Sequence, residues 1–407
     1  MAVERLREDP VLLIEGPRTV GKSTMLRALA AACDAEVLDL DEPGTRDAVA
    51  IDPSTFVAGA RPVFVDEYQK APVVLDAIKA QLNLDARPGR FALTGSTRHD
   101  SLPPAAQALT GRLARLPLLP LSQGEIHGVR EHLVADLLTD PDGTVSEVPT
   151  SSTDREEYLR RILAGGFPMA LARGSDAARA RWLDSYVSLT LERDVRELSR
   201  IRQGAQLPLL LARLAGQTAQ LLSVQDAARD LALDRVTAES YTRLLEAVFL
   251  VHRLPAWGKT LTARAVGTPK IHVLDSGVAA RLLRLTLPKL VSKDPMALQE
   301  LGHLLESFVV AEILKQTSWL DEITVAGHWR TRDGDEVDLI LEHDDGSLVG
   351  IEVKAAARVP GDDFRALRKL RAAAGTAFRA GVVLYLGQRS YTYEDQLHAM
   401  PVDRLWT

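Results

Sequence analysis

Two stretches of the sequence, one near each end, contain residues whose types and spacing suit phosphate and metal chemistry. The first fits the pattern G-x4-G-K-[ST] with Gly16, Pro17, Arg18, Thr19, Val20, Gly21, Lys22 and Ser23, and Thr24 follows as a further candidate. Glycines let backbone N–H groups wrap phosphate oxygens, and the helix that follows adds partial positive charge. Lys22 would reach the β- and γ-phosphates, and the Ser23 hydroxyl would bind Mg²⁺. The loop therefore predicts a site for ATP and Mg²⁺.

An acidic pair completes this first site. The apolar run PVFVDE ends in Asp66 and Glu67. Asp66 would hold Mg²⁺ through water, and Glu67 would orient and polarise the attacking water. The pair favours hydrolysis, which argues against the alternative of a small-molecule kinase.

Two further contributions to the first site stay open. Thr94 or Ser96, at the end of the run FALTGS, is a candidate hydrogen-bond partner of the γ-phosphate or the water. Arg112 is a candidate phosphate ligand, in the same subunit or a neighbour, because its guanidinium fork suits phosphate. Arg98 and Arg193 compete with it for this role.

The second stretch, near the C-terminus, reads GDEVDLILEHDDGSLVGIEVKAA. Two extended runs flank the turn-forming residues HDDGS, so it predicts a hairpin. With the turn centred near Asp345, Asp338 lies across from Glu352, and strand alternation puts Glu352 and Lys354 on one face. A register slip of one residue would undo this arrangement.

The hairpin carboxylates are candidate Mg²⁺ ligands, together with Glu306 on the preceding apolar helix. Lys354 would then orient a water or stabilise charge on a phosphate. Surface hairpins also pair acids with lysines, so a structural role is the alternative. Glu336 and Glu342 flank this second site and are alternative ligands. Three histidines lack metal-ligand spacing, and we interpret them as structural or surface residues: His272, His303 and His328.

Hydrophobic patterning divides the chain into four parts. Residues 1–130 alternate apolar runs with helical stretches, which is typical of a parallel sheet. Residues 131–154 are acidic and rich in Pro, Gly, Ser and Thr, which predicts a linker. Residues 155–265 are helical and include the outline of a winged helix, with Ser223 and Thr237 as N-caps. Residues 266–407 form a second α/β module.

Bulk composition limits the class of protein. The chain has 407 residues, 46% of them hydrophobic and 26% charged, as in ordinary globular proteins. The net charge of −6 argues against a uniformly basic, nucleic-acid-binding surface. Cys33 is the single cysteine, which excludes an internal disulfide and fits a reducing cytosol. No apolar signal core or membrane-spanning run is present, so we expect a cytoplasmic protein.

The motifs resemble those of a known family. GPRTVGKST, VFVDEYQKAP and FALTGS are similar to AAA-type P-loop ATPases of bacteria and archaea. GGFP, LERDVREL, VLDSGVAARLL, LLESFVVAEIL and EVDLILE…IEVK resemble the domain usually fused to those ATPases, which is of unknown function and similar to restriction-endonuclease-like folds. The resemblance covers nearly the whole chain. It implies ATP binding and hydrolysis and a nuclease-like C-terminal domain of the PD-(D/E)xK type.

These patterns together predict an α/β protein with an ATPase sheet, a central helical or winged-helix region and a restriction-endonuclease-like domain. The expected function is an ATP-dependent enzyme that acts with Mg²⁺ on structured or branched DNA. The alternative is an ATP-controlled regulatory or nucleic-acid-binding ATPase with an inert nuclease-like domain. Because AAA-type modules often bind ATP between subunits, a homo-oligomer is expected.

Overall fold

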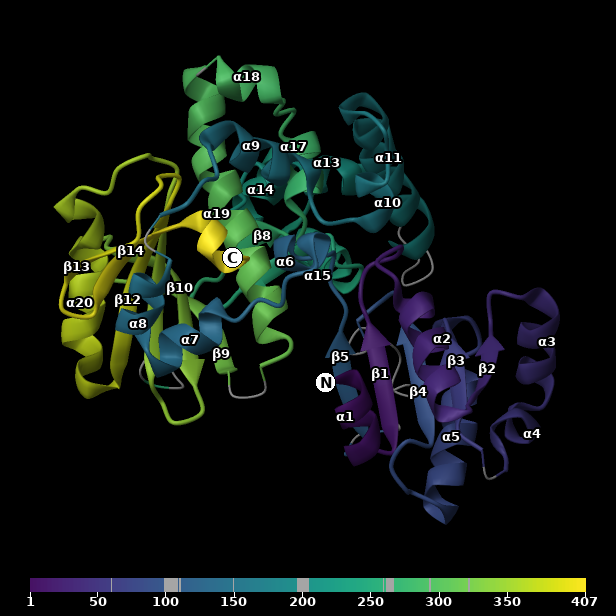
Figure 1. The fold of residues 1–407 in the computed structure, drawn as a ribbon. Coiled ribbons are helices and arrows are strands. Elements are labelled where there is room, and N and C mark those ends of the chain that lie inside the picture. Colours follow the sequence, from purple (N-terminus) through teal and green to yellow (C-terminus); the bar gives the residue numbers. More distant parts are fainter. Residues whose placement is uncertain are drawn as a thin grey trace. The chain divides into compact units, whose positions relative to one another are not determined.

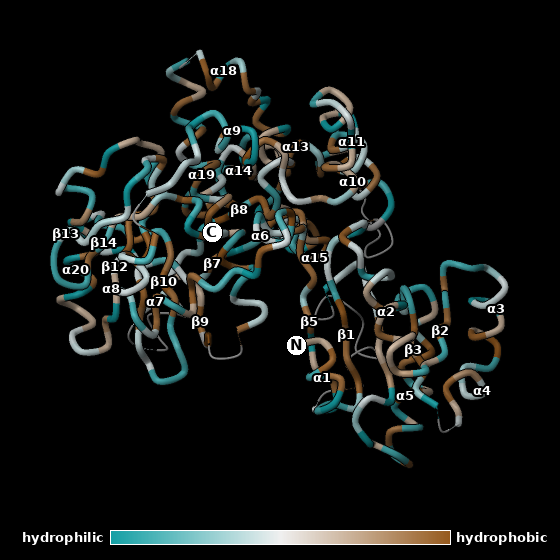
Figure 2. The backbone as a smooth tube through the Cα atoms, in the orientation of Figure 1, coloured by the Kyte–Doolittle hydropathy of each residue, from teal (hydrophilic) through white to brown (hydrophobic). Residues whose placement is uncertain are grey.

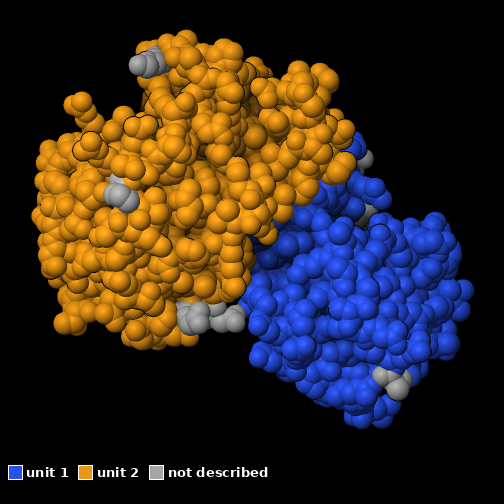
Figure 3. Space-filling view, in the orientation of Figure 1, with its two compact units in different colours: residues 1–120, 189–202, 243–249 blue, residues 121–188, 203–242, 250–407 orange. Residues whose placement is uncertain are grey.

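Two compact units make up the chain (Figure 3). The structure, a computed structural model, describes residues 1–59, 61–98, 109, 111–148, 150–195, 205–258, 260, 267–292, 294–320 and 323–407. Unit 1 comprises residues 1–120, 189–202 and 243–249, and unit 2 comprises residues 121–188, 203–242 and 250–407. Each predicted site falls within a single unit.

Unit 1 is built on a parallel sheet of five strands in the order β2-β3-β4-β1-β5. The strands are β1 (Val11–Glu15), β2 (Glu36–Asp39), β3 (Val63–Asp66), β4 (Phe91–Gly95) and β5 (Leu113–Pro117). These are the apolar runs that the sequence analysis assigned to strands. Every residue of β1, β3 and β4 is buried, as expected for strands with both faces covered.

Helices cover both faces of this sheet, as Figure 1 shows. They are α1 (Ala2–Glu8), α2 (Lys22–Cys33), α3 (Pro43–Ile51), α4 (Pro53–Val57), the 3₁₀ turn η1 (Tyr68–Lys70) and α5 (Val73–Leu84). Alternate residues of β1 enter different cores: Leu13 packs in the cluster that holds Ile78 of α5, and Leu12 in the cluster that holds Leu26 of α2. The brown strands in Figure 2 mark this apolar centre. The N-terminal sheet is thus confirmed as predicted.

The helical middle of the chain contains several short helices. They are α6 (Gln123–His127), α7 (Leu133–Thr139), α8 (Pro141–Glu147), α9 (Arg155–Ala164), α10 (Pro168–Leu171), α11 (Asp176–Leu189), a π-helical turn (Thr190–Asp194), α13 (Gln206–Ala215), α14 (Val224–Asp230) and α15 (Arg235–Ala247). The predicted linker over 131–154 is wrong, because it contains α7 and α8. Leu133, Val134 and Leu137 are buried, and Arg404 donates to the carbonyl of Thr144 at 3.1 Å. Apolar residues within the acidic stretch therefore dock it onto the C-terminal sheet.

A small antiparallel sheet in the order β6-β8-β7 follows α13 in the chain. Its strands are β6 (Gln220–Leu221), β7 (Val251–Leu254) and β8 (Lys270–Val273). The element order helix, strand, helix, helix, strand, strand is that of the predicted winged helix. Ser223 caps α14 by accepting from the Asp226 N–H, as predicted. Thr237 does not cap α15; Asp234 does, accepting from the Thr237 N–H at 2.9 Å.

The C-terminal part of unit 2 is a mixed sheet of six strands in the order β13-β14-β12-β11-β10-β9. The strands are β9 (Ile323–Arg330), β10 (Glu336–His343), β11 (Leu348–Lys354), β12 (Phe378–Tyr385), β13 (Tyr391–Glu394) and β14 (Leu397–Pro401). The helices are α17 (Ser276–Leu282), α18 (Leu287–Val291), α19 (Pro295–Thr317) and α20 (Arg365–Ala374), with 3₁₀ turns at Gly361–Phe364, Gly375–Ala377 and Val402–Leu405. Both α19 and α20 contact β11, and Figure 1 shows them on opposite faces of the sheet.

Two of the motifs that carried the family resemblance meet in unit 2. Asp275, in VLDSG, accepts from the backbone N–H of Gly166, in GGFP, at 2.8 Å. It also caps α17 by accepting from the Val278 N–H at 2.9 Å. A side chain at Gly165 would collide with Asp275, since its Cβ would lie 2.4 Å from Oδ1. These contacts hold the two motifs together within unit 2.

Candidate functional sites

The phosphate-binding loop (residues 16–24) joins the end of β1 to the start of α2. Gly16 has no room for a side chain, because a Cβ there would lie 1.9 Å from the Leu118 carbonyl oxygen. Gly21 has φ +105°, a conformation that side chains rarely adopt. The Lys22 ammonium is buried and donates to the carbonyls of Gly16 at 3.0 Å and Pro17 at 2.8 Å. The lysine is thus held within the loop.

The remaining residues of the loop complete its shape. Thr19 is exposed in the left-handed region at φ 62°, and Val20 is buried. Arg18 is half-buried, whereas Thr24 is exposed on the first turn of α2. These four positions agree with a backbone cradle, and their contact with a nucleotide stays a prediction.

Asp66 meets the phosphate-binding loop at the end of β3. Its Oδ1 accepts from the Ser23 hydroxyl at 3.1 Å and from the Thr94 hydroxyl. Three residues that are distant in sequence are therefore brought together as predicted. Serine hydroxyl and aspartate oxygens are hard ligands of the kind that Mg²⁺ prefers. The donor set fits a magnesium ion shared with the phosphates of a nucleotide.

Thr94 contacts both members of the acidic pair. Its hydroxyl donates its single hydrogen to Asp66 and accepts from the Glu67 N–H at 2.9 Å. The side chain is fully buried. Thr94 thus braces the acidic pair, and its contact with the γ-phosphate or the attacking water stays a prediction. The other candidate, Ser96, accepts from Gln69 at 2.9 Å.

Glu67 is held by its backbone and its side chain. It has φ 56°, a conformation that is costly for a residue with a Cβ and that clusters at functional sites. The amide of Gln69 donates both to the Glu67 carboxylate and to Ser96. Gln69 thus fixes the carboxylate relative to β4. The sequence analysis missed this role, although the spacing of Glu67 and Gln69 was visible.

Arg112 lies where the sheet's strands begin, whereas the phosphate-binding loop of the same chain lies where they end. Leu113 pairs with Val11 at the start of β1, whereas the loop follows the end of β1, roughly 13 Å away at the usual strand rise. The Arg112 guanidinium donates to Asn83 Oδ1 at 2.8 Å. A role in the same subunit is therefore wrong, and a role toward a neighbour stays a prediction. Of its competitors, Arg98 lies over the Phe249 ring at 5.1 Å, and Arg193 acts electrostatically on Asp41.

The C-terminal hairpin has the predicted register. Leu339 pairs with Ile351 and Ile340 with Gly350, which places Asp338 across from Glu352. Asp338 Oδ2 accepts from the Val353 N–H at 2.9 Å. The Lys354 ammonium donates to Glu352 Oε1 at 2.6 Å. The prediction that these side chains converge at one end of the hairpin is therefore confirmed.

The predicted metal position is instead filled by Lys270, the first residue of β8. Its ammonium donates to Glu306 Oε1 at 2.6 Å and to Asp338 Oδ1 at 3.0 Å, and it also pairs with Glu336. Lys270 is 1% exposed. Within the described ranges, no group of three or more His, Cys, Asp or Glu side chains is arranged to hold a metal ion. Magnesium ligation by Glu306, Asp338 and Glu352 is therefore corrected to a lysine–carboxylate cluster.

The two alternative ligands of this second site, Glu336 and Glu342, have different surroundings. Glu336 belongs to the cluster and is also paired with Arg330 at 3.1 Å. Glu342 does not belong to it, since it accepts from the Trp257 indole N–H at 2.6 Å. Glu352 Oε2 is buried and has no hydrogen-bond partner among the described residues.

Burial and mutual charge dominate the electrostatics of the cluster. Burial, followed by the charge of Asp338, raises the pKa of Glu306 well above its ordinary value and raises that of Glu352 too. Burial alone lowers the pKa of Lys270, but Asp338, Glu306 and Glu336 outweigh it, so the net pKa is raised. Lys270 therefore stays charged and is the cation that these three acidic groups share.

Sequence reasoning missed Lys270 because nothing in its spacing connects it to the carboxylates. A lysine that opens the apolar run KIHVLD is a weak signal that it is buried. The histidines near it are structural, as interpreted: His272 contacts Ser307 at 3.1 Å, and His328 contacts the Thr268 carbonyl at 3.0 Å.

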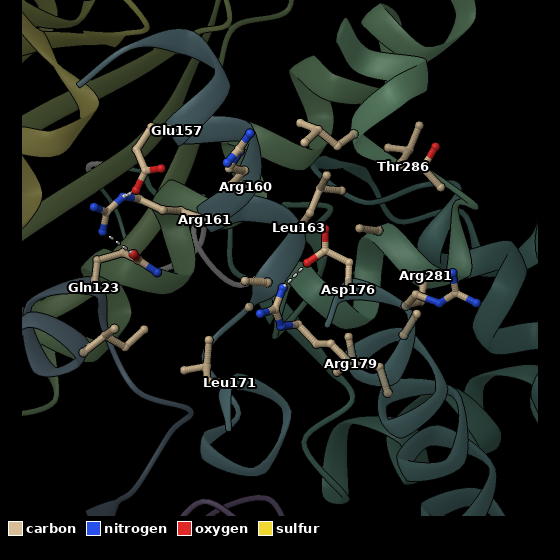
Figure 4. Close-up of a pocket in the computed structure, with 18 of the residues that line it drawn as sticks. Gln123, Glu157, Arg160, Arg161, Leu163, Leu171, Asp176, Arg179, Arg281 and Thr286 are labelled. Atoms are coloured by element: carbon tan, nitrogen blue, oxygen red, sulfur yellow. Dashed lines mark hydrogen bonds and ion pairs between the residues drawn. The ribbon is translucent and has the colours of Figure 1, made fainter. Parts of the chain in front are cut away.

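A cavity of about 560 Å³ lies elsewhere in unit 2, between α9, α11 and α17 (Figure 4). Its wall contains apolar residues such as Leu163 and Leu171, and four arginines. Each arginine has an acidic partner, the pairs being Arg160–Glu156, Arg161–Glu157, Arg179–Asp176 and Arg281–Asp184. The cavity shares no residue with either predicted site.

Comparison with known families defines the class of the N-terminal part. Residues 8–127 match the family described as AAA domain, so unit 1 contains an AAA-type P-loop ATPase domain. Residues 155–289 and 301–405 match two domains of unknown function, DUF8612 and DUF4143. Within the described ranges, none of the helices is long and apolar enough to cross a membrane.

Similarity to two relatives extends over nearly the whole chain. Over 403 residues, it is 27% identical to the uncharacterized proteins Mb2031c of Mycobacterium bovis and Rv2008c of Mycobacterium tuberculosis, covering 99% of this chain and 82% of each relative. It is also similar to the solved Walker-type ATPase PABY2304 of Pyrococcus abyssi, with 17% identity, a TM-score of 0.43, and coverage of 69% of this chain and 93% of that one.

Proposed function

We propose that the chain is a Mg²⁺-dependent ATP hydrolase whose C-terminal domain binds or regulates rather than cleaves. The observation that carries the first half is the 3.1 Å contact between the Ser23 hydroxyl and Asp66. It joins the phosphate-binding loop to the acidic pair. Ser23 and Asp66 would hold Mg²⁺ there, and the ion would supply positive charge that neutralises the nucleotide phosphates.

The residues of the site divide the work of hydrolysis. Lys22 would leave the carbonyls of Gly16 and Pro17 to bind phosphate oxygens, which are stronger acceptors because they are charged. Glu67, aimed by Gln69, would orient the attacking water and draw off its proton. Thr94 would keep Asp66 and Glu67 in their places.

Glu67→Gln tests this assignment. The variant keeps the shape of the side chain but loses the charge, so ATP turnover should fall by roughly 10²–10⁴-fold, as for loss of a general base. ATP affinity, measured by titration with a fluorescent analogue, should stay within about twofold of wild type. Turnover equal to that of wild type would remove Glu67 from the reaction. Glu125→Gln, a change in the cap of α6 in unit 2, is the matched control and should hydrolyse ATP normally.

The second half of the proposal, that the C-terminal domain does not cleave, rests on Lys270. Because one ammonium already engages Glu306, Asp338 and Glu336, the second site lacks the free carboxylates that a metal-dependent nuclease uses. Cleavage remains the second candidate function, favoured by the hairpin register and by the unpartnered Glu352 Oε2. Incubation with Mg²⁺ and linear, forked and four-way DNA separates the two. Cutting by wild type that is lost in Lys354→Ala would establish the nuclease.

DNA and a second copy of the chain are the proposed partners. The winged-helix order of elements supports DNA, although α15 carries few basic residues, with Arg235 exposed at its start. The position of Arg112, away from its own loop, supports a homo-oligomer in which it serves a neighbour. Light scattering of Glu67→Gln with ATP tests assembly, and an Arg112→Ala variant with normal turnover in the assembled state would reject the arginine's role.

A further inference from the structure

One buried lysine sits where a metal ion was expected in the C-terminal unit. Its nitrogen lies 2.6 Å from Glu306 Oε1 and 3.0 Å from Asp338 Oδ1, and it also contacts Glu336. One carboxylate comes from α19 and two from β10. We propose that the Lys270 ammonium is the built-in cation of this cluster and takes the place that a hard divalent cation would need among these carboxylates.

The backbone fixes this cation in place. Lys270 pairs with Leu221 of β6 on one side and with Leu254 of β7 on the other. A tethered ammonium with 1% exposure does not exchange with solvent ions. A divalent ion could therefore bind only by displacing the Lys270 ammonium, which the backbone holds in the cluster. Competition of this kind distinguishes the cluster from an ordinary surface group of carboxylates.

Removing the lysine would leave Glu306, Asp338 and Glu336 without the cation that they now share. Carboxylate oxygens are the preferred ligands of magnesium and manganese. Mg–O distances of about 2.0–2.1 Å are shorter than the ammonium contacts, so the carboxylates would close in slightly around the ion. Glu352 adds a buried oxygen, Oε2, that has no partner among the described residues. That oxygen is an independent sign that the cluster has unused capacity for a ligand.

Lys270→Met tests the proposal, because methionine replaces the apolar stem of lysine but lacks the ammonium group. Mn²⁺ binding is measured by electron paramagnetic resonance, without nucleotide, in wild type and variant. The variant should bind one Mn²⁺ at least tenfold more tightly than wild type. Adding Asp338→Asn should abolish the gain. Lys315→Met is the matched control, since Lys315 is a buried lysine paired with Glu312 at 2.5 Å and should yield no such site.

Each outcome decides the proposal. A folded Lys270→Met variant, checked by circular dichroism, that binds Mn²⁺ no better than wild type would overturn it. If this variant does not fold, wild type is compared with Asp338→Asn alone. Equal, weak Mn²⁺ binding by those two proteins supports the proposal, and wild-type binding that depends on Asp338 overturns it. None of these readouts depends on ATP hydrolysis, so failure here is separate from failure of the proposed function.

Discussion

The chain has two centres: the first is the phosphate-binding loop with Asp66 and Glu67, and the second is the cluster around Lys270. Both use lysines and carboxylates, but the charged groups have different hydrogen-bond partners. At the first centre, Lys22 donates to neutral carbonyls and Asp66 accepts from neutral hydroxyls. At the second, Lys270 and Lys354 donate directly to carboxylates. The first arrangement leaves formal charges to be met by a ligand, whereas the second pairs charged groups of opposite sign with one another.

This difference explains why similar motifs carry different functional weight. A phosphate-bound Mg²⁺ adds positive charge that Asp66 can accept without displacing a cation. A metal at the second centre has to compete with an ammonium that the fold holds in place. Motif spacing alone does not report such compensation, because the compensating residue comes from another part of the sequence.

The largest expected effect comes from removing the Lys270 ammonium from its cluster of carboxylates. Lys270→Met should destabilise the protein by about 3 kcal/mol at pH 8, the usual cost of stripping one partner from a buried ion pair. Burial and Asp338 raise the pKa of Glu306 while Lys270 lowers it, so removal of Lys270 raises this pKa further. The folded variant therefore takes up protons more readily than the unfolded chain, and its stability rises as pH falls. The loss should be smaller at pH 6.

Urea denaturation at pH 8 and pH 6 measures this effect. In wild type, the raised pKa of Lys270 means that its contribution is present at both values and is lost only at strongly alkaline pH. Lys289→Met, at an exposed position on α18, is the control and should stay within about 0.5 kcal/mol. A loss for Lys270→Met that is equal at both pH values would contradict this electrostatic account.

A smaller effect, confined to nucleotide binding, is expected at the first centre. Lys22→Ala should weaken ATP binding by about 2 kcal/mol or more, since hydrogen bonds to charged groups contribute roughly that much. Titration with a fluorescent ATP analogue measures it. Lys79→Ala, on the exposed face of α5, should bind as wild type does. Lys354→Ala should leave ATP affinity and turnover unchanged. Equal loss in Lys22→Ala and Lys354→Ala would mean that the two centres do not act separately.

The smallest effect concerns positioning at the first centre. Gln69→Ala frees the Glu67 carboxylate and should lower kcat about tenfold, an effect of roughly 1.4 kcal/mol. KM for ATP should be unchanged, because Gln69 contacts Glu67 and Ser96 rather than the phosphate-binding loop. Steady-state kinetics separates the two parameters. A rise in KM at constant kcat would show that Gln69 supports binding instead of aiming the carboxylate.

The sequence alone determined the elements that depend on local pattern. The apolar runs of β1, β3 and β4 and the glycine spacing of the phosphate-binding loop predicted the first centre, because buried parallel strands and tight loops restrict residue type strongly. The hairpin register followed from alternation and turn residues, which is why Asp338 and Glu352 meet as predicted. The acidic stretch at 131–154 misled the analysis, since a few apolar residues were enough to dock it.

Tertiary structure decided how charges pair across distant segments. Lys270 reaches Glu306 and Asp338 only because β8, α19 and β10 pack together, and Thr94 braces Asp66 only because β3 and β4 are neighbours. Coulomb interactions and desolvation depend on distance and burial in space, and neither quantity is written in the spacing of residues along the chain.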